Sequence, residues 1–191
     1  MREYTDRKFK EVTNKGKIFL FSDAHFDHKN IIRYCHRPFH STREMNQTLL
    51  ENWCNSVKEK DEVYFLGDMS YGRNRRPIDY WLSRVTGEIS YIRGNHDTDI
   101  INQATVIHSH YEIQYNNYQF LLMHDPHRPN GYEGWIIHGD KHNNNLKEFP
   151  FINQKNKTVN VCAELVDYTP LEINKLISLI ETGRSYKTSN G

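Results

Sequence analysis

Residues 17–25 of the chain read KIFLFSDAH, an apolar run that ends in side chains able to bind metal ions. The run from Lys17 to Ser22 is too short for a helix and is typical of a strand buried on both faces. Gly16 precedes this run, and Asp23 and His25 follow it. We therefore expect a buried strand that places Asp23 at its carboxyl end.

The following stretches alternate between helix and strand patterns. Residues 41–44 (STRE) form a capping-box pattern, and apolar residues at helical spacing follow them, which predicts a helix over about 42–58. Residues 62–66 (EVYFL) and 88–92 predict two further strands, with a helix over 77–85 between them. This alternation predicts parallel strands joined by right-handed crossovers, with their carboxyl ends along one edge of the sheet.

The second half of the chain has a different pattern, made of short strand candidates. These cover residues 105–115, 118–123, 134–139 and 158–162. Asn116-Asn117 is a plausible hairpin turn, so this half is expected to be largely antiparallel. Thr169-Pro170, followed by an apolar stripe that ends at Gly183, predicts a final helix.

Length and composition favour one globular domain over residues 1–191, with residues 1–16 as an extension and 184–191 as a tail, both peripheral. The formal net charge of +1 provides no global field for nucleic acid or membrane binding, so neither is favoured as a partner. Three widely spaced cysteines without a CxxC pair argue against a disulfide framework. Together with the lack of a signal-like or membrane-spanning apolar run, they favour a cytoplasmic protein.

Five segments in the chain end in carboxylate, imidazole or amide side chains. They are Ser22-Asp23-Ala24-His25, Gly67-Asp68, Gly94-Asn95-His96-Asp97, Met123-His124-Asp125 and Gly139-Asp140-Lys141-His142. Each segment alone is more typical of a turn or a cap than of a functional site. All five in succession at predicted strand ends instead indicate a site for divalent ions such as Mn²⁺, Fe²⁺, Zn²⁺ or Ni²⁺.

In this order, the segments resemble the motifs of the calcineurin-like metallophosphoesterase superfamily, and Gly-Asn-His-Asp is the most specific of them. The stretch after His25 is similar to that of small bacterial and phage members. The resemblance spans Asp23 to His142 and implies an α/β (α+β) fold: a four-layer αββα sandwich of two mixed β-sheets flanked by helices. It also implies two divalent metal ions at one end of the sandwich.

Carried over residue by residue, the resemblance implies a ligand set for each ion. One metal would be bound by Asp23, His25 and His142, and the other by Asn95 and His124, with Asp68 bridging the two. Two such ions can bind a phosphoryl oxygen and activate a water for in-line attack. The resemblance further implies that His96 donates to the leaving-group oxygen and that Asp97 orients His96.

One position departs from the family pattern. The superfamily motif Gly-His-x-His is Gly139-Asp140-Lys141-His142 in this chain, with Asp140 in place of the first histidine. Asp140 is expected to be a ligand, which would favour a harder metal. Otherwise, that metal site is weakened, or His138 replaces the missing ligand from the other side of Gly139.

Residues that follow the first motif are candidates for substrate binding. His28, Asn30 and Arg37 belong to the stretch that resembles small family members, although Arg37 beside Pro38 is equally compatible with a structural turn.

The sequence therefore predicts a hydrolase that acts on a small phosphoester, with a phosphodiester favoured over a phosphomonoester. Two alternatives stay open: an inactive metal-binding interaction module, which the change at Asp140 permits, and a nuclease, which the balanced charge disfavours.

Overall fold

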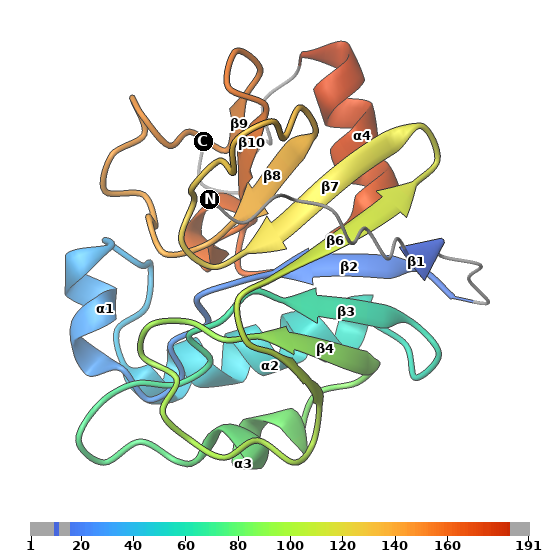
Figure 1. Ribbon diagram of the computed structural model, residues 1–191. Helices are drawn as coiled ribbons and strands as arrows, with labels where there is room; N and C mark the ends of the chain where they lie inside the picture. Colours follow the sequence, from blue (N-terminus) through green and yellow to red (C-terminus); the bar gives the residue numbers. More distant parts are fainter. Residues whose placement is uncertain (1–9, 12–15, 184–191) are drawn as a thin grey trace.

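The computed structural model describes residues 10–11 and 16–183 (Figure 1). Most of the expected extension over 1–16 and all of the expected tail over 184–191 lie outside the described residues. In the described part, a six-stranded and a five-stranded sheet, both mixed, combine with four α-helices. This arrangement confirms the expected α/β sandwich with two mixed sheets.

The five-stranded sheet contains the strands that the first half of the sequence predicts. Its order is β11-β2-β3-β4-β5, and β2 to β5 are mutually parallel, whereas β11 is antiparallel to β2. The bounds are β2 (Ile18–Phe21), β3 (Glu62–Phe65), β4 (Glu88–Ile92), β5 (Thr105–Ile107) and β11 (Leu171–Glu172). The predicted parallel arrangement of the first three strands is therefore confirmed.

The six-stranded sheet has the order β1-β6-β7-β8-β10-β9. Its strands are β1 (Lys10–Glu11), β6 (His110–Tyr115), β7 (Tyr118–Met123), β8 (Trp135–His138), β9 (Ile152–Asn153) and β10 (Thr158–Asn160). The β6–β7 hairpin is antiparallel as expected, and Asn116 in its turn has φ 52°. However, β7 pairs with β8, and β8 with β10, in parallel. The expectation of a largely antiparallel second half was therefore wrong, because long connections allow crossovers that short turns do not.

The helices are α1 (Lys29–Tyr34), α2 (Thr42–Ser56), α3 (Ile78–Leu82) and α4 (Ile173–Thr182), with a short 3₁₀ helix, η1 (Ala163–Leu165). In Figure 1, α2 and α3 lie beside the five-stranded sheet, and α4 lies near the β6–β7 hairpin. The hydroxyl of Tyr118 in this hairpin donates to Glu181 of α4 at 3.2 Å.

Successive residues of β3 show how the core is divided between the layers. The Tyr64 ring stacks on Tyr111 of the other sheet, with ring centroids 5.8 Å apart. The next residue, Phe65, packs at 5.8 Å from Trp53 of α2. Side chains along a strand alternate between the two faces of a sheet. Both faces of β3 are therefore buried, one against the second sheet and the other against α2.

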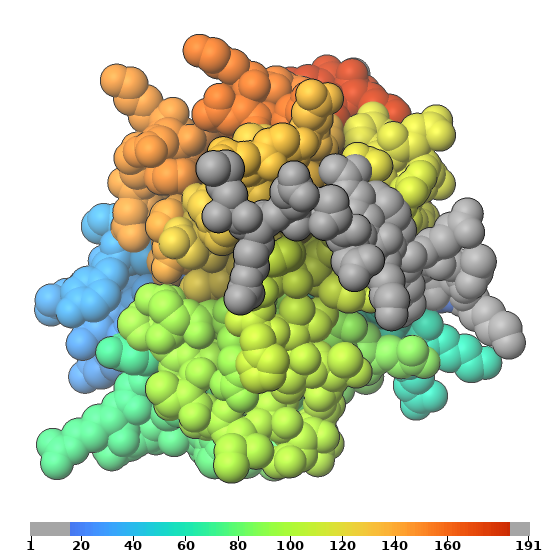
Figure 2. Space-filling model, in the orientation of Figure 1, coloured from blue at the N-terminus to red at the C-terminus, as the bar shows by residue number. Residues whose placement is uncertain are grey.

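Two loops meet beside the carboxyl ends of the strands. The side-chain amide of Asn143, after β8, donates to the carbonyl of Cys35, after α1, at 2.8 Å. Figure 2 shows these neighbouring segments, blue for α1 and orange for the chain after β8, on the same side of the molecule. None of the described helices is both long and apolar enough to cross a membrane.

Candidate metal centre

Strand ends from both sheets bring the five sequence motifs together. β2, β3 and β4 precede Asp23, Asp68 and Asn95, whereas β7 and β8 precede His124 and Asp140. The two sheets are joined at this end by a bridge between Ser22 and Cys162, in which Ser22 N–H donates to Val161 at 3.2 Å. The two sheets therefore build one site together.

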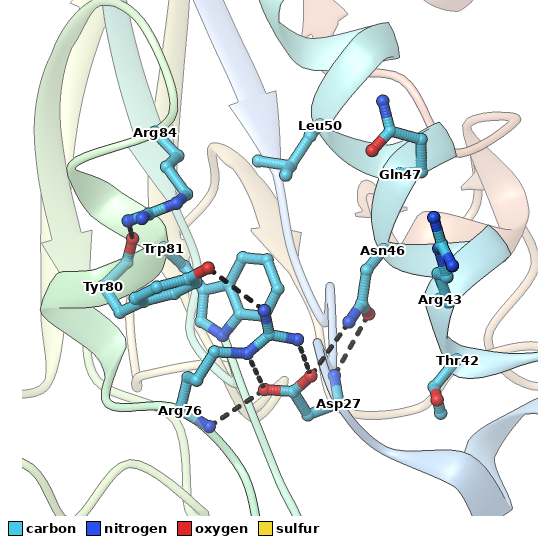
Figure 3. A pocket seen from close by; sticks show the side chains of 10 residues that line it. All are labelled: Asp27, Thr42, Arg43, Asn46, Gln47, Leu50, Arg76, Tyr80, Trp81 and Arg84. Atoms are coloured by element: carbon cyan, nitrogen blue, oxygen red, sulfur yellow. Dashed lines mark hydrogen bonds and ion pairs between the residues drawn. The ribbon is translucent and has the colours of Figure 1, made fainter.

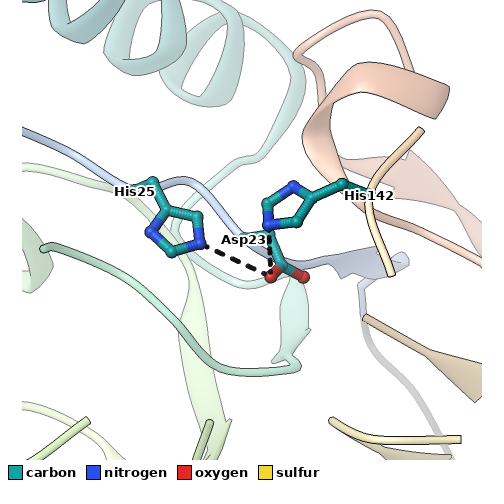
Figure 4. Close-up of side chains that lie close together, drawn as sticks. All are labelled: Asp23, His25 and His142. Atoms are coloured by element: carbon teal, nitrogen blue, oxygen red, sulfur yellow. Dashed lines mark ion pairs between the residues drawn. The ribbon is translucent and has the colours of Figure 1, made fainter. Parts of the chain in front are cut away.

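The first group of converging donor atoms surrounds Oδ1 of Asp23 (Figure 4). Nε2 of His142 lies 3.5 Å and Nε2 of His25 lies 3.7 Å from this oxygen. Nε2 of His25 is also 3.5 Å from Oδ2 of Asp68. Asp23 Oδ1 and His25 Nε2 are buried and have no hydrogen-bond partner among the described residues. Such separations suit atoms that share one cation at bond lengths of about 2.0–2.2 Å.

The second group surrounds Nε2 of His124. Oδ2 of Asp68 and Oδ1 of Asp140 both lie 3.6 Å from this nitrogen, and Oδ1 of Asn95 lies 2.8 Å from it. Nδ1 of His124 donates to the carbonyl of Leu66 at 2.7 Å, because a carbonyl can only accept. In the neutral ring, Nε2 therefore keeps its lone pair for a ligand.

Asp68 contributes to both groups and shows the electrostatic cost of the crowded carboxylates. Burial, together with the negative charge of Asp23, raises the pKa of Asp68 to about 7. Burial opposes the charged form of His142, but the Asp23 carboxylate raises the pKa of His142 to about 11. Both shifts favour added positive charge at this position. The donor set therefore fits divalent cations, which supply such charge.

Five of the ligand candidates have backbone angles in the left-handed region. Their φ angles are 57° at Asp23, 50° at His25, 60° at Asp68, 64° at Asp140 and 47° at His142. Non-glycine residues adopt such angles rarely and at a cost, and these residues cluster at functional sites.

Two glycines of the motifs allow the loops to approach each other closely. A Cβ at Gly94 would lie 2.1 Å from Oδ1 of Asp68, and a Cβ at Gly139 would lie 2.1 Å from Oγ of Ser22. No side chain fits at these distances, so both positions require glycine.

Hydrogen bonds orient the Asp23 carboxylate. Its Oδ2 accepts from Oγ of Ser22 at 2.5 Å, from N–H of Asp140 at 3.0 Å and from Sγ of Cys162 at 3.2 Å. These donors hold Oδ2 on the protein side and leave Oδ1 directed at the two histidines. No pattern in the sequence assigns this role to Ser22 or Cys162.

Glu164 is a further residue that the sequence motifs missed. Its carboxylate accepts from Nδ1 of His142 at 3.2 Å and from the Arg37 guanidinium at 2.7 Å. Burial alone would raise the pKa of Glu164, but Arg37 and His142 hold it at about 2. Glu164 therefore fixes the ring of His142 so that Nε2 faces Asp23. It lies outside the five motifs, so no local signal indicates this role.

The expectation that Arg37 faces the substrate needs correction. Arg37 is only 3% exposed, and besides Glu164 its guanidinium donates to the carbonyls of Asp23 and Ala24, both at 2.8 Å. Arg37 therefore holds the first metal motif from behind, and its donors are already occupied.

The expected contact between Asp97 and His96 also needs correction. Oδ2 of Asp97 accepts from the N–H groups of Asp68 at 2.9 Å and Gly94 at 2.8 Å. Among the described residues, no hydrogen bond joins it to the His96 ring. The buried Asp97 carboxylate therefore ties two motif loops together, because unpaired backbone donors attract it there.

The alternative ligand His138 lies outside both groups. Its ring is fully buried, Nδ1 lies 2.9 Å from the carbonyl of Gly139, and the ring packs at 5.9 Å from Phe149. Oδ1 of Asp140 belongs to the second group, whereas Oδ2 accepts from Nζ of Lys141 at 2.5 Å.

A cleft of about 470 Å³ opens over both groups of donor atoms. His28, Asn30 and His96 line this cleft together with His25 and Asp68. Burial and the nearby His25 lower the pKa of His28 to about 4. Two of the three expected substrate-binding residues, His28 and Asn30, therefore lie beside the candidate metal ligands.

Asp27 anchors the loop that carries His25. Its carboxylate accepts from Arg76 and from the side-chain amide of Asn46 on α2, the latter at 2.9 Å (Figure 3). Asn46 also accepts from the N–H of Asp27 at 3.1 Å. The Arg76 guanidinium lies 4.3 Å from the centre of the Trp81 ring. These contacts hold the first motif between α2 and α3.

The chain matches the calcineurin-like phosphoesterase family over residues 16–183, which include every donor described above. The chain belongs to the calcineurin-like phosphoesterase family. Membership of this family supports the assignment of the chain as a metal-dependent phosphoesterase. Such a protein is a hydrolase of ester bonds and acts on a small substrate. The groups of candidate metal ligands in the structure agree with this assignment.

Two similar proteins match most of the length of this chain. An uncharacterized protein of Methanocaldococcus jannaschii is 45% identical over 177 residues, which cover 91% of this chain and 97% of that protein. The crystal structure of a protein of unknown function from Aquifex aeolicus has a TM-score of 0.66 at 20% identity. The match covers 86% of this chain and 100% of the other, and at this identity it shows the fold alone.

Proposed function

We propose that this calcineurin-like phosphoesterase is a cytoplasmic, binuclear metal-dependent phosphodiesterase, formed by a single domain over residues 1–191. The observation that supports it most strongly is the convergence of two groups of donor atoms on the shared carboxylate of Asp68. A second metal would have no separate ligand set without Asn95, His124 and Asp140. The preference for a diester over a monoester rests on the resemblance to small family members.

Each residue has a defined task in this proposal. Asp23, His25 and His142 hold one ion, Asn95, His124 and Asp140 hold the other, and Asp68 binds both. Two divalent ions there would bind a phosphoryl oxygen and activate a water for in-line attack. Mn²⁺, Fe²⁺, Zn²⁺ and Ni²⁺ are the candidates, and the oxygen ligand Asp140 favours the harder ones.

His96 is proposed to donate a proton or hydrogen bond to the leaving-group oxygen. Its backbone N–H donates to Oδ1 of Asp68 at 3.1 Å, and its ring lines the cleft 5.9 Å from the His25 ring. His96 is thus near the donor atoms without belonging to either group. His28 and Asn30 are proposed to contact the part of the ester that does not react.

The proposal is tested on chelator-treated protein with bis-p-nitrophenyl phosphate and p-nitrophenyl phosphate. Mn²⁺, Ni²⁺, Zn²⁺ or Mg²⁺ is added back, and Asp68→Asn is the control because it removes the shared ligand. We expect metal-dependent release from the diester that exceeds release from the monoester and is abolished in Asp68→Asn. A preference for the monoester would contradict the assignment as a phosphodiesterase. Absence of release from both esters with every metal would contradict the assignment as an enzyme.

The two alternatives predict different results in the same preparation. An inactive interaction module would bind metal but hydrolyse neither ester. A nuclease would cut single-stranded DNA at least as fast as the small diester. We expect little DNA cleavage, because no lysine or arginine is among the described residues that line the metal cleft.

A further inference from the structure

Four ring side chains form a continuous rim over the metal cleft. This aromatic rim consists of Tyr34, His28, Tyr71 and His96, all of which line the cleft. The ring centroids are 6.3 Å apart between Tyr34 and His28, 4.7 Å between His28 and Tyr71, and 4.4 Å between Tyr71 and His96. The rim therefore reaches from the end of α1 to the proposed leaving-group donor.

The two tyrosines of the rim present large ring surfaces to solvent. Tyr34 is 57% exposed and Tyr71 is 38% exposed. Aromatic side chains beside a concave site are typical lining of small-ligand sites. No hydrogen bond of either phenol to another described residue is found, so no hydrogen bond of the hydroxyl accounts for the position of these rings.

The backbone of Tyr71 is held in place even though its ring is exposed. Its N–H donates to the carbonyl of Phe26 at 3.1 Å, and the preceding Ser70 forms a bridge with Phe26. Phe26 in turn lies between His25 and Asp27 in the anchored first motif. The backbone of Tyr71 therefore has a fixed position relative to the first motif, and its ring lies 6.2 Å from the ring of His25.

The charges in the cleft limit what the rest of the substrate can be. Its described lining contains His25, Asp68, Asp140 and His142 as metal-binding candidates but no lysine or arginine. A second phosphate of the substrate would find no lysine or arginine among these lining residues. A flat, uncharged ring would instead find the aromatic rim, and a volume of about 470 Å³ lies in the usual range for small-ligand sites.

We propose that the aromatic rim stacks on the planar ring of a nucleotide, so that the substrate is a small ester with one phosphate and a nucleobase. This inference rests on the proposed function, because it assumes that the phosphate occupies the metal centre. Tyr71 contributes the main stacking surface and Tyr34 extends it. Stacking tolerates any base, since every base has a π-face.

The test compares two ligands that share a sugar phosphate and differ only in the base. Binding of adenosine 5′-monophosphate and of ribose 5-phosphate to the Mn²⁺-reconstituted full chain is measured by titration calorimetry. We expect the nucleotide to bind at least about tenfold more tightly, the size of effect that base stacking on aromatic side chains produces. Tyr71→Ala should abolish most of this preference, Tyr34→Ala should reduce it, and Tyr71→Phe should retain it.

Tyr115→Ala serves as the matched control, because Tyr115 lies in β6 and its hydroxyl donates to Asn174 of α4. This variant should keep the full preference. Circular dichroism of each variant checks the fold. Equal affinities for the two ligands in the unmodified protein, or an unchanged preference in both Tyr71→Ala and Tyr34→Ala, would overturn the proposal. If neither ligand bound while the same preparation hydrolysed bis-p-nitrophenyl phosphate, this inference would be overturned and the proposed function would stand; absence of that hydrolysis would instead contradict the proposed function.

Discussion

At the scale of single residues, Asp140 is the side chain that separates this chain from the usual family motif. Its Oδ1 lies 3.6 Å from His124, and Lys141 occupies its other oxygen. The lysine limits the negative charge that the carboxylate adds to the site. A carboxylate paired in this way can bind a cation through the remaining oxygen.

Replacing Asp140 should therefore change metal content. We expect Asp140→Ala to bind one ion per chain instead of two. Asp140→His should bind two, with the preference moved from Mn²⁺ towards Zn²⁺, because imidazole is a softer ligand. Elemental analysis after dialysis measures both. Asp125→Ala is the control, since Asp125 binds the same Lys141 at 2.7 Å but belongs to neither group. Two ions in Asp140→Ala would refute the ligand role.

Glu164 should act as a positioning residue for His142. We expect Glu164→Gln to lower metal affinity by about 10- to 100-fold, the usual cost of losing the partner that orients a ligating histidine. Titration with Mn²⁺ measures the affinity, and circular dichroism checks the fold. Glu172→Gln, which removes the ion pair with Lys17, should bind Mn²⁺ normally. Unchanged affinity in Glu164→Gln would show that the hydrogen bond is not needed.

Loss of His96 should lower turnover and leave metal binding intact. For a diester with an alcohol leaving group, His96→Ala should reduce kcat by about 10²- to 10⁴-fold, the range for a general acid. The loss should be smaller for p-nitrophenyl esters, because nitrophenolate needs little proton donation. The control is His127→Ala, because His127 is exposed and lies outside both donor groups. Equal losses on both kinds of ester would argue against proton donation by His96.

At the scale of secondary structure elements, local signals were reliable where the partner of a residue is nearby in sequence. Oγ of Ser41 accepts from N–H of Glu44 at 3.1 Å at the start of α2, as the capping-box pattern predicts. Glu44 reaches back to N–H of His40 at 2.7 Å, one residue earlier than the usual partner. The helix starts at Thr42 as predicted.

The contribution of this cap can be measured. Ser41→Ala should lower the free energy of unfolding by about 1 kcal/mol, because it leaves a backbone donor of the first turn without its partner. Urea titration of the metal-free protein gives the value. Ser178→Ala, at an exposed interior position of α4, should be neutral or slightly stabilising, because alanine has the higher helix propensity. Similar losses in both variants would contradict the capping explanation.

Local sequence signals did not predict how the strands of the six-stranded sheet pair with one another. The β6–β7 hairpin follows from a tight turn, but β8 lies parallel to both β7 and β10. Strand direction after a long loop depends on which faces can be buried, and a short apolar run such as residues 135–138 is compatible with either direction.

At the scale of the whole molecule, two sheets supply one charged site, so metal binding should stabilise the entire sandwich. At about 100 times its dissociation constant, Mn²⁺ should raise the free energy of unfolding by about 2.7 kcal/mol. For a chain of this length, the midpoint of thermal unfolding should then rise by about 5–10 °C. Differential scanning calorimetry with and without Mn²⁺ measures the shift.

The control for this prediction is Asp68→Asn. The pKa of Asp68 is raised because its charge is buried beside Asp23, so removing that charge should leave the metal-free protein at least as stable. The same variant should gain little from Mn²⁺. If Asp68→Asn were stabilised by Mn²⁺ as much as the unmodified protein, the ion would bind elsewhere.

The sequence by itself determined the strands that carry the motifs and the donor residues at their carboxyl ends. Asp23, Asp68 and Asn95 follow buried runs whose periodicity can be recognised locally, and parallel strands bring such ends to one edge. The structure brings the predicted metal ligands of the motifs into two groups that share Asp68.

Only the tertiary structure decided which side chains support those donors and which face the cleft. Arg37 and Glu164 are 127 positions apart and meet behind the metal centre, and Tyr71 reaches the cleft from the loop after β3. A local pattern reports whether a residue is buried in a strand or helix. It does not report a hydrogen-bond partner from a distant segment, because that pairing exists only after the two sheets have packed.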